Sequence, residues 1–565
     1  MNDAKKLRNW LILVILACLA LYLVGNGQVS LWDRDEGWYA QCSKQMWETG
    51  DWVVPRFLDQ LRTEKPVFVY WLQLGGMALF GGPSEFSVRF YAAVAQTAVL
   101  CILGFSLIKL VGPARALWTT FTYGTCVMAI IAAKMCLTDA TLMVFLVTAQ
   151  LCLFRFYLRG FNWPLFLLFS VALGFGGLTK GPIAFVPPLA TLLVLGIIDW
   201  RKWTPHLSLA SFTKWALIVL ASLAISILVC APWLIILHLR EPAWLTNTLG
   251  IGLQHLTTSM EGHTGPFGYY LALVWGTYFP WSLFLPLAAY VAWKQRHVPR
   301  TRFAIAAVLG PWLFFELMGT KLPHYPLPAY PFLSLLVADA ILRCSRKQYP
   351  ELFRTRTVIA VGIWALPVGL VASVPWLALY ATPQLAALPY LPMTVVSIAG
   401  LACTVGTWWF FYRRKPLVAC AYLGASFMVL IALAYGWLIP QCQFLQTSPK
   451  VAQILRNNGG GADQAAVGEV VTLLYTEEGE TFGYQEPTLM YYQGGTVRPL
   501  TSDNLFATPK AQWPKLIVVT SDIWTRLTPE VQQQLEVVGS VRGFLYSAGG
   551  LVMDVMVVRA KPSVQ

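Results

Sequence analysis

The amino-acid sequence predicts a polytopic α-helical membrane protein with a small α/β domain at its C-terminal end. Of the 565 residues, 57% are hydrophobic and only 12% are charged. Apolar runs of membrane-spanning length follow one another up to Pro440, and shorter runs follow after it. A single soluble core of this composition would leave a very large apolar surface in water.

We count an apolar run as a membrane span when it is long enough to cross the hydrocarbon core. A span needs roughly 20 apolar residues, because the hydrocarbon core is about 30 Å thick and an α-helix rises about 1.5 Å per residue. We expect about thirteen spans, with centres near residues 18, 100, 122, 149, 171, 191, 226, 281, 311, 335, 369, 401 and 428. We expect the first run to remain as a span, because no small-residue cleavage site follows it.

Lys and Arg cluster at every second boundary between these runs, from Lys5, Lys6 and Arg8 to residues 413–415. Basic clusters mark cytoplasmic loops, so we expect a cytoplasmic N-terminus and a C-terminal segment on the opposite face of the membrane. The formal net charge of +14 then reflects topology. We expect no nucleic-acid partner, because no basic stretch alternates with stacking aromatics.

The residues after Pro440 change character. Strand-length runs, KLIVVTS and GLVMDVMVVRA, alternate with the helix-like stretches SPKVAQILRNN and TPEVQQQLEVV, each opened by Ser or Thr before Pro. We therefore predict a membrane domain of residues 1–440, with a first external loop at 27–83, and an α/β domain of residues 441–565. Cys42 and Cys442 are candidates for a disulfide, but their Cα separation is not readable from sequence, so that pairing stays open.

The loops on the face opposite the N-terminus hold acids and isolated lysines. Asp35 and Glu36 follow the first span and open EGWYAQCSKQMWETG, where helix capping is a sufficient explanation for one acid. Lys65 stands in LRTEKPVFVYW beside Glu64 and Arg62. Snorkelling of a lysine is the simpler explanation there.

Three further stretches on the same face carry polar residues. Asp139 opens a span in KMCLTDAT, and Lys180 lies between two spans in GLTKGP, where a lysine is costly unless an anion or a cavity receives it. GTKLPHYPLPAYP places Lys321, His324 and Tyr325 among helix-breaking prolines. Each stretch has a structural explanation by itself, but their shared side of the bilayer favours a functional site.

The ordered set DRDEGWYAQ, TEKPVFVYW, LTDAT, GLTKGP, MEGHTGPFGYY, KLPHYPLPAYP and GYQEPTLMYY resembles the membrane glycosyltransferases of the GT-C fold. It is most similar to the branch with the bacterial lipid A aminoarabinose transferases and, more distantly, the protein O-mannosyltransferases. The resemblance covers nearly the whole chain. It implies a GT-C transmembrane core, two juxtamembrane helices in the first external loop and a periplasmic C-terminal α/β domain.

The resemblance, together with the polar stretches on this face, leads us to expect the following roles for residues. The catalytic carboxylates are expected at Asp35, the main one, Glu36 and Asp139. The groups that bind the donor phosphate are expected at Lys65, Lys180, Tyr325 and Arg62. The residues that contact the acceptor or line closing loops are expected at Glu64, His255, His263, Lys321 and His324.

The chain departs from the family pattern in two places. Gly37 and Trp38 stand where a basic residue is usual, and in QHLTTS Gln254 replaces an acid while an arginine is missing. These departures bear on which acceptor molecule receives the sugar. Asp35, Glu64 and His263 are candidate ligands of a divalent cation, but no ligand spacing accompanies them, and we expect that no cofactor is required.

The chemistry of a polyprenyl phosphate donor suits these residue types. Its phosphate gains charge as it leaves, which Lys65 would stabilise, and Asp35 would take the proton of an acceptor hydroxyl, a role worth about 10²–10⁴ in rate. One base and one cation suffice for inverting displacement, whereas a retaining route needs a second carboxylate as nucleophile. If the acceptor is itself a phosphate, Asp35 would mainly orient a substrate.

We therefore predict an inverting glycosyltransferase of the bacterial inner membrane. It would move a sugar, with 4-amino-4-deoxy-L-arabinose as the candidate, from undecaprenyl phosphate to lipid A or another envelope glycolipid. Transfer to protein Ser or Thr is the alternative within this class. A lipid flippase or transporter would show inverted repeats and midplane polar residues, and a non-catalytic scaffold would tolerate replacement of the first-loop acids. The oligomeric state stays open.

Overall fold

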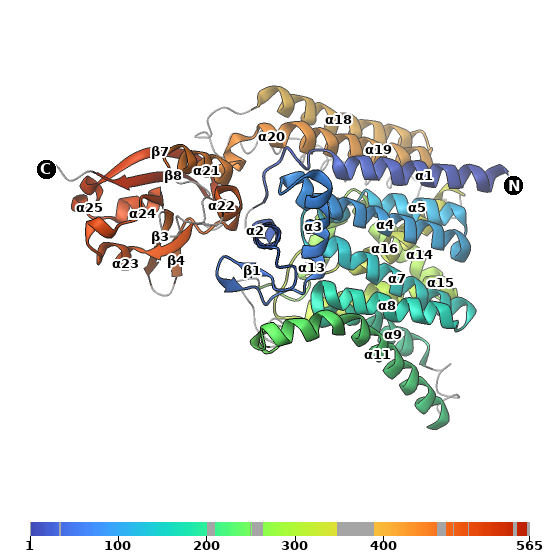
Figure 1. Cartoon of the computed structure of the whole chain (residues 1–565). Coiled ribbons are helices and arrows are strands. Elements are labelled where there is room, and N and C mark those ends of the chain that lie inside the picture. The colour runs from blue at the N-terminus through green and yellow to red at the C-terminus, as the bar shows by residue number, and fades with distance from the viewer. Residues whose placement is uncertain are drawn as a thin grey trace.

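The computed structural model shows an elongated molecule, with a helical bundle at one end and a mixed α/β part at the other (Figure 1). It describes residues 2–32, 35–200, 209–248, 250, 264–346, 389–459, 470–477, 480–494, 497–545 and 551–561. The N-terminus lies at the far end of the bundle, and the C-terminus lies at the far end of the α/β part.

Long apolar helices form the bundle and run side by side (Figure 1). Its helices are α1 (Asn2–Leu23), α3 (Phe68–Phe80), α4 (Glu85–Val111), α5 (Pro113–Gly124), α6 (Val127–Lys134), α7 (Thr138–Arg159), α8 (Trp163–Lys180), α9 (Val186–Ile198), α11 (Leu209–Arg240), α13 (Tyr269–Thr277), α14 (Leu285–Lys294), α15 (Pro299–Leu317), α16 (Tyr330–Ser345), α18 (Tyr390–Tyr412) and α19 (Pro416–Leu433). Short turns connect some of them: η1 (Gly181–Phe185), η3 (Trp281–Phe284), η4 (Leu327–Ala329), η6 (Ala434–Leu438), α20 (Ile439–Gln441) and η7 (Gln443–Leu445).

Within the described residues, eight helices are long and apolar enough to cross a membrane, or up to ten if each of two bent pairs counts as one span. The pairs are α5 with α6, bent by 63°, and α13 with the 281–294 helix, bent by 119°. Every predicted span centre except the one near residue 369 falls in a helical segment. That centre lies outside the described residues, so the count of about thirteen stays a prediction.

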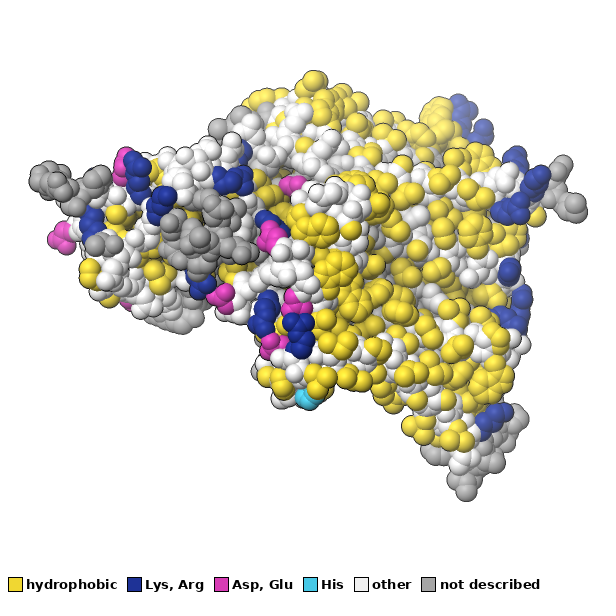
Figure 2. All heavy atoms as spheres, in the orientation of Figure 1, with side chains coloured by type: hydrophobic (Ala, Val, Ile, Leu, Met, Phe, Trp, Pro, Cys, Tyr) yellow, Lys and Arg dark blue, Asp and Glu magenta, His cyan; other side chains and the backbone are white. Residues whose placement is uncertain are grey.

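The two ends of the bundle carry different charged side chains. Lys and Arg gather at the end where the N-terminus lies, an apolar band follows, and acids appear with bases toward the α/β part (Figure 2). Contacts between helix ends agree with this arrangement: Arg159 donates to the Lys109 backbone oxygen, and Arg302 pairs with Asp199 at 2.7 Å. The basic clusters in the described part of the bundle therefore lie at one end.

The first external loop forms two helices and a small hairpin. Helix α2 (Asp35–Thr49) covers nearly all of the stretch EGWYAQCSKQMWETG, and the short apolar helix α3 follows it. Between them, β1 (Arg56–Phe57) and β2 (Gln60–Leu61) pair antiparallel. The two juxtamembrane helices that the resemblance implies are thus present.

The α/β part contains a six-stranded mixed sheet. Its strands are β3 (Val470–Glu477), β4 (Glu480–Gly483), β5 (Arg498–Thr501), β6 (Leu516–Thr520), β7 (Leu535–Leu545) and β8 (Leu551–Ala560). The order is β4-β3-β6-β8-β7, with β5 also pairing with β3. Strand β3 runs parallel to β5 and β6, and the other pairs are antiparallel.

Helices cover the sheet on both faces, because its strands alternate their apolar side chains between them. The helices are α21 (Thr447–Asn457), α22 (Pro487–Gln493), α23 (Ser502–Phe506), α24 (Ser521–Arg526) and α25 (Pro529–Gln534). Leu516 and Val518 of β6 share one apolar cluster with α21, α22 and α2, whereas Ile517 and Val519 face a second cluster with Ile523 of α24. The α/β part is therefore packed directly onto the first external loop.

The structure shortens one helix expected in the α/β domain and bears on the expected domain boundary and cysteine pair. The stretch TPEVQQQLEVV is helical only to Gln534, because Leu535 and Val537 pair with Ala560 and Val558 of β8. The predicted boundary at residue 440 falls within α20, and we retain it as a proposal. Cys42 and Cys442 are both buried and free.

Candidate active site

The adjacent acids Asp35 and Glu36 have opposite environments at the start of α2. Asp35 is exposed, whereas Glu36 is fully buried. The Glu36 carboxylate accepts two hydrogen bonds from Arg89, at 2.9 Å from Nε and 2.5 Å from Nη2. It also accepts the backbone N–H groups of Trp32 and Cys136, both at 2.8 Å. The Glu36 oxygens are therefore occupied by protein donors, and only Asp35 of the pair faces the solvent side.

Arg89 is a residue that our reading of the sequence missed. It lies in α4 with no exposed surface, and its Nη1 donates to the backbone oxygens of Asn26 and Val29 at 3.0 and 2.6 Å. It thereby ties the chain between α1 and α2 to α4. The available signal was an arginine just inside an apolar run, which is costly unless it is paired.

Asp139, Lys180, His324 and Tyr325 converge from three elements. Asp139 opens α7 and accepts a hydrogen bond from Lys180 Nζ, at the end of α8, at 2.8 Å. His324 Nε2 lies 3.7 Å from the other Asp139 oxygen. The Lys180 ammonium lies 5.6 Å from the centre of the Tyr325 ring. The structure thus brings together three sequence stretches that only their sidedness had linked.

Lys65 lies in the chain segment just before α3, beside this group. Burial first, and then the charges of Lys180 and Arg62, lower its pKa to about 8. Neighbouring Arg62 forms an ion pair with Glu64 at 2.9 Å and stacks 4.7 Å above the Trp38 ring. Within the described part of the chain, Lys65 itself has no hydrogen-bond or ion-pair partner. It is the cation of this group that is available to a ligand.

Electrostatic interactions connect Asp35 to the same group. Burial, then Asp139 and Asp35, raise the pKa of the Tyr325 hydroxyl. Burial also raises the pKa of Tyr39, and the charges of Arg62, Asp139 and Asp35 all act on its hydroxyl. Asp35 therefore shares its surroundings with Asp139 and Tyr325.

An aromatic surface adjoins the charged group. The rings of Phe145 in α7 and Phe175 in α8 stack at 5.5 Å, and Phe68 at the start of α3 packs against both, at 5.7 and 5.4 Å. All three side chains are partly exposed. A ligand with one charged end and one apolar end would match this combination of surfaces.

The chain that carries Lys65 is held in place by residues beyond α11. Trp244 Nε1 donates to the Arg62 backbone oxygen at 2.9 Å, and Thr248 Oγ1 donates to the Thr63 oxygen at 2.6 Å. Earlier in the loop, Arg240 forms two hydrogen bonds with Asp51 at 2.8 Å. These contacts fix the backbone of the segment and leave the Lys65 side chain unbonded.

The other predicted residues are distributed differently. Lys321 is buried, and its Nζ donates to the backbone oxygens of Glu316 and Met318 at 2.6 and 3.1 Å, which satisfies the end of α15. His255 and His263 lie outside the described residues. Among the residues that are described, no group of three or more His, Cys, Asp or Glu converges as metal ligands.

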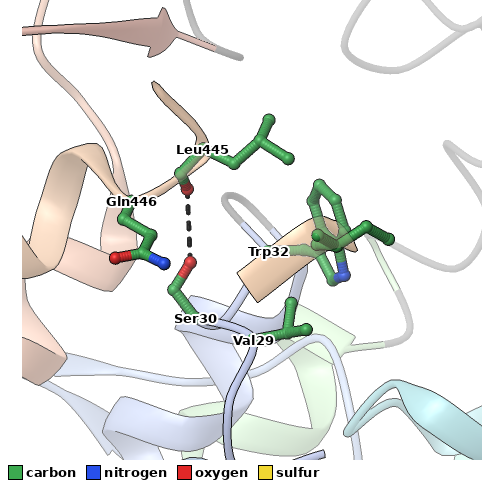
Figure 3. Close-up of a pocket in the computed structure, with 6 residues that line it drawn as sticks. Val29, Ser30, Trp32, Leu445 and Gln446 are labelled. Carbon is green, nitrogen blue, oxygen red and sulfur yellow. Dashed lines mark hydrogen bonds between the residues drawn. The ribbon is translucent and has the colours of Figure 1, made fainter. Parts of the chain in front are cut away.

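A small pocket adjoins the Glu36 network, because Trp32 lines it and donates its backbone N–H to Glu36 (Figure 3). Its lining residues are Val29, Ser30, Trp32, Ile439, Leu445 and Gln446. Ser30 Oγ donates to the Leu445 backbone oxygen at 3.2 Å across it. None of the predicted site residues lines this pocket, so we place the candidate site at the Lys65–Asp139–Lys180 group.

Comparisons with known proteins agree with this architecture. The family model for dolichyl-phosphate-mannose-protein mannosyltransferase matches residues 10–247. The undecaprenyl phosphate-alpha-4-amino-4-deoxy-L-arabinose arabinosyl transferase of Aeromonas salmonicida is 31% identical over 449 residues, which are 77% of this chain and 78% of that protein. The protein of the same name from Pectobacterium carotovorum is 31% identical over 457 residues, 77% and 76% of the two chains.

The solved structures of ArnT from Cupriavidus metallidurans, in the apo state and bound to undecaprenyl phosphate, superpose with TM-scores of 0.72 and 0.71. They are 20% and 19% identical and cover 98% of both chains. The helical bundle, its acidic first loop and the outer sheet thus define a membrane glycosyltransferase of the GT-C fold. Within that class, the chain belongs to the undecaprenyl phosphate-alpha-4-amino-4-deoxy-L-arabinose arabinosyl transferase family.

Proposed function

We propose that this enzyme transfers a sugar, with 4-amino-4-deoxy-L-arabinose as the preferred candidate, from undecaprenyl phosphate to lipid A or another envelope glycolipid. The names of its relatives support the donor and the sugar. The observation that carries the proposal is Lys65, a partly buried ammonium that has no partner among the described residues and lies beside the Asp139–Lys180 ion pair and the aromatic surface. An anionic headgroup with a long apolar tail would satisfy both surfaces at once.

In the proposed mechanism, Lys65 binds the donor phosphate and stabilises the charge that grows on it as the glycosidic bond breaks. Such stabilisation accelerates the reaction only where it is stronger in the transition state than in the ground state. Lys180 adds positive charge but is held by Asp139. Tyr325, under the Lys180 ammonium, supports the same phosphate through its hydroxyl.

Asp35 is the proposed general base for the acceptor hydroxyl, because it is the exposed member of the acidic pair. Deprotonated oxygen then attacks the anomeric carbon opposite the phosphate, so the configuration inverts. We assign Glu36 a positioning role, since its oxygens are taken up by Arg89 and two backbone N–H groups. If the acceptor is a phosphate, Asp35 orients it instead of deprotonating it.

No step of this mechanism passes through a divalent cation. Of the three candidate ligands, Glu64 pairs with Arg62, and His263 lies outside the described residues. We propose that the transfer requires no cofactor. Assays with the purified enzyme after EDTA treatment are expected to keep full turnover, and a loss that added cation restores would contradict this.

We also propose that the enzyme lies in the bacterial inner membrane with its N-terminus in the cytoplasm. The gathering of Lys and Arg at the N-terminal end of the bundle supports this orientation (Figure 2). The candidate site and the sheet domain would then face the periplasm, where lipid A is accessible.

The decisive experiment uses the full chain in lipid nanodiscs with an undecaprenyl phosphate sugar and purified lipid A. Mass spectrometry is expected to show lipid A that has gained the sugar. A Ser/Thr peptide in a parallel reaction tests the alternative acceptor. Glycosylated peptide without modified lipid A would favour the O-mannosyltransferase-like alternative, and movement of the donor across the bilayer without transfer would favour a flippase.

A further inference from the structure

Hydrogen bonds from several elements hold the segment 29–32, which leads into α2. Arg89 Nη2 donates to the Ser30 backbone oxygen at 2.9 Å. The Trp32 backbone N–H donates to the Glu36 carboxylate at 2.8 Å. Both partners, in α4 and α2, belong to the first part of the chain.

Two tyrosine hydroxyls from the last part of the chain hold the same segment. The Leu31 backbone N–H donates to the Tyr492 hydroxyl at 2.8 Å, and the Trp32 indole N–H donates to the Tyr435 hydroxyl at 2.9 Å. The partners are 461 and 403 positions apart in the sequence. Tyr492 lies in α22 of the sheet domain, and Tyr435 lies in η6, directly after α19.

Both tyrosines have fixed surroundings of their own. The Lys134 ammonium lies 4.4 Å from the centre of the Tyr435 ring and donates to the Val24 backbone oxygen at 2.6 Å. The Tyr492 backbone oxygen accepts a hydrogen bond from Arg456 of α21 at 2.6 Å. Each hydroxyl is therefore presented to the segment from a well-anchored element.

Side-chain packing is incomplete on one side of the segment, because the small pocket lies there (Figure 3). Ser30 Oγ reaches across this pocket to the Leu445 backbone oxygen, but the distance of 3.2 Å is long for a hydroxyl donor. Incomplete packing leaves more of the positioning of residues 29–32 to directional hydrogen bonds.

We propose that Tyr435 and Tyr492 are positioning residues for the transfer reaction, which set the geometry of the helix start that carries Asp35. This rests on the proposed function, in which Asp35 is the base. A base must lie about 2.6–3.2 Å from the atom whose proton it takes, and a misplacement of about 1 Å can cost about 10²-fold in rate. The sheet domain and the chain after α19 thereby complete the site from outside it.

The test uses Tyr435→Phe and Tyr492→Phe, which each remove one hydroxyl and keep the ring. Tyr422→Phe and Tyr475→Phe are the matched controls. Tyr422 donates to the Ala402 backbone oxygen at 3.0 Å, between α19 and α18, and Tyr475 packs on the second apolar cluster of the sheet. All variants are the full chain in lipid nanodiscs.

Turnover is measured per enzyme molecule that binds donor, so that unfolded protein does not enter the result. Tyr435→Phe and Tyr492→Phe are each expected to lower kcat by about tenfold to hundredfold. Donor KM is expected to stay near the wild-type value, because Lys65 lies on a different segment. Wild-type kcat in either variant would remove that tyrosine from the proposal, and an equal loss in the controls would overturn it.

Amide hydrogen exchange without substrate tests the anchoring independently of the proposed function. The Leu31 N–H loses its acceptor in Tyr492→Phe, so the peptide that covers residues 29–32 is expected to exchange about tenfold faster than in the wild type and in Tyr475→Phe. Unchanged exchange would overturn the anchoring by Tyr492. A wild type that transfers no sugar would refute the proposed function, whereas the exchange result decides the anchoring by itself.

Discussion

Lys65 holds an ammonium group in a crowded, positively charged place without an acceptor among the residues described. Arg62 beside it is neutralised by Glu64, and Lys180 by Asp139. Keeping this one lysine unpaired at the site therefore lowers the stability of the folded protein. Such a cost is reasonable where a substrate anion completes the arrangement.

The pKa of Lys65 leads to a pH dependence of donor binding. The pKa is lowered to about 8 in the free enzyme, and a bound phosphate raises it again. The contribution of Lys65 to donor affinity is thus fully present well below pH 8 and falls as the pH rises through 8, by about tenfold at pH 9. Donor KM measured against pH checks this, and Lys65→Arg should abolish the dependence because arginine stays charged.

Removing the charge gives a second prediction at this residue. Lys65→Ala is expected to weaken donor binding about tenfold to hundredfold, the range for a hydrogen bond to a charged group. Lys44→Ala, which removes a lysine of α2 that donates to the Tyr491 backbone oxygen, is the comparison. Unchanged donor kinetics in Lys65→Ala would remove its assigned phosphate role.

Asp35 and Glu36 are expected to respond differently to loss of charge. Asp35→Asn should reduce kcat by about 10²–10⁴ while donor binding and folding persist. Glu48→Gln, on the exposed end of the same helix, is the matched control and should retain activity. The readout is turnover together with donor affinity, and wild-type turnover in Asp35→Asn would exclude it as the base.

Glu36→Gln should instead destabilise the protein by about 3–5 kcal/mol, because it leaves the buried Arg89 without its counter-charge. Thermal unfolding in detergent measures this. A folded, stable but inactive Glu36→Gln enzyme would argue for a direct catalytic role and against the positioning role.

At the scale of elements, the contact between α2 and α22 joins the candidate site to the sheet domain. A Cβ placed on Gly37 would lie 2.6 Å from the Thr488 backbone nitrogen and 2.9 Å from the Pro487 carbonyl carbon. Nearby, the Leu31 backbone N–H donates to the Tyr492 hydroxyl at 2.8 Å. The glycine that departs from the family pattern thus permits close packing of α22 against the helix that carries Asp35.

Gly37→Ala is therefore expected to separate α2 from α22 and to destabilise the protein by about 1–3 kcal/mol, the usual range for overpacking. Activity should fall with it, because Asp35 begins the same helix. Gly75→Ala in α3 is the control, since its Cβ would meet no atom within 4 Å. Equal stability of the two variants would show that the α2–α22 contact can relax freely.

At the scale of the whole molecule, charged side chains are distributed unevenly along the long axis. Lys and Arg gather at the N-terminal end of the bundle, an apolar band follows, and acids lie together with further Lys and Arg toward the sheet domain (Figure 2). The proposed orientation predicts that a cysteine at Lys515 reacts with a membrane-impermeant maleimide added to intact spheroplasts, and that one at Lys415 reacts only after lysis. Labelling in the reverse order would invert the topology.

The sequence predicted the bundle and the outer sheet well, because span length and strand length follow directly from runs of apolar residues. It also predicted that Asp139, Lys180 and Tyr325 share one side of the membrane, since sidedness follows from alternation. The sequence did not show which of Asp35 and Glu36 is buried. Neighbouring side chains on a helix point about 100° apart, and which of the two points inward is seen only once Arg89 of α4 is in place.

What the sequence by itself determined is the class of protein: apolar length, basic clusters and ordered motifs are local properties of the chain. The tertiary structure alone decided which charges cancel. Arg89 neutralises Glu36, Asp139 holds Lys180, and Lys65 has no partner among the residues described. Ion pairing depends on separations of a few ångströms between residues far apart in the chain, and those distances exist only once the helices have packed.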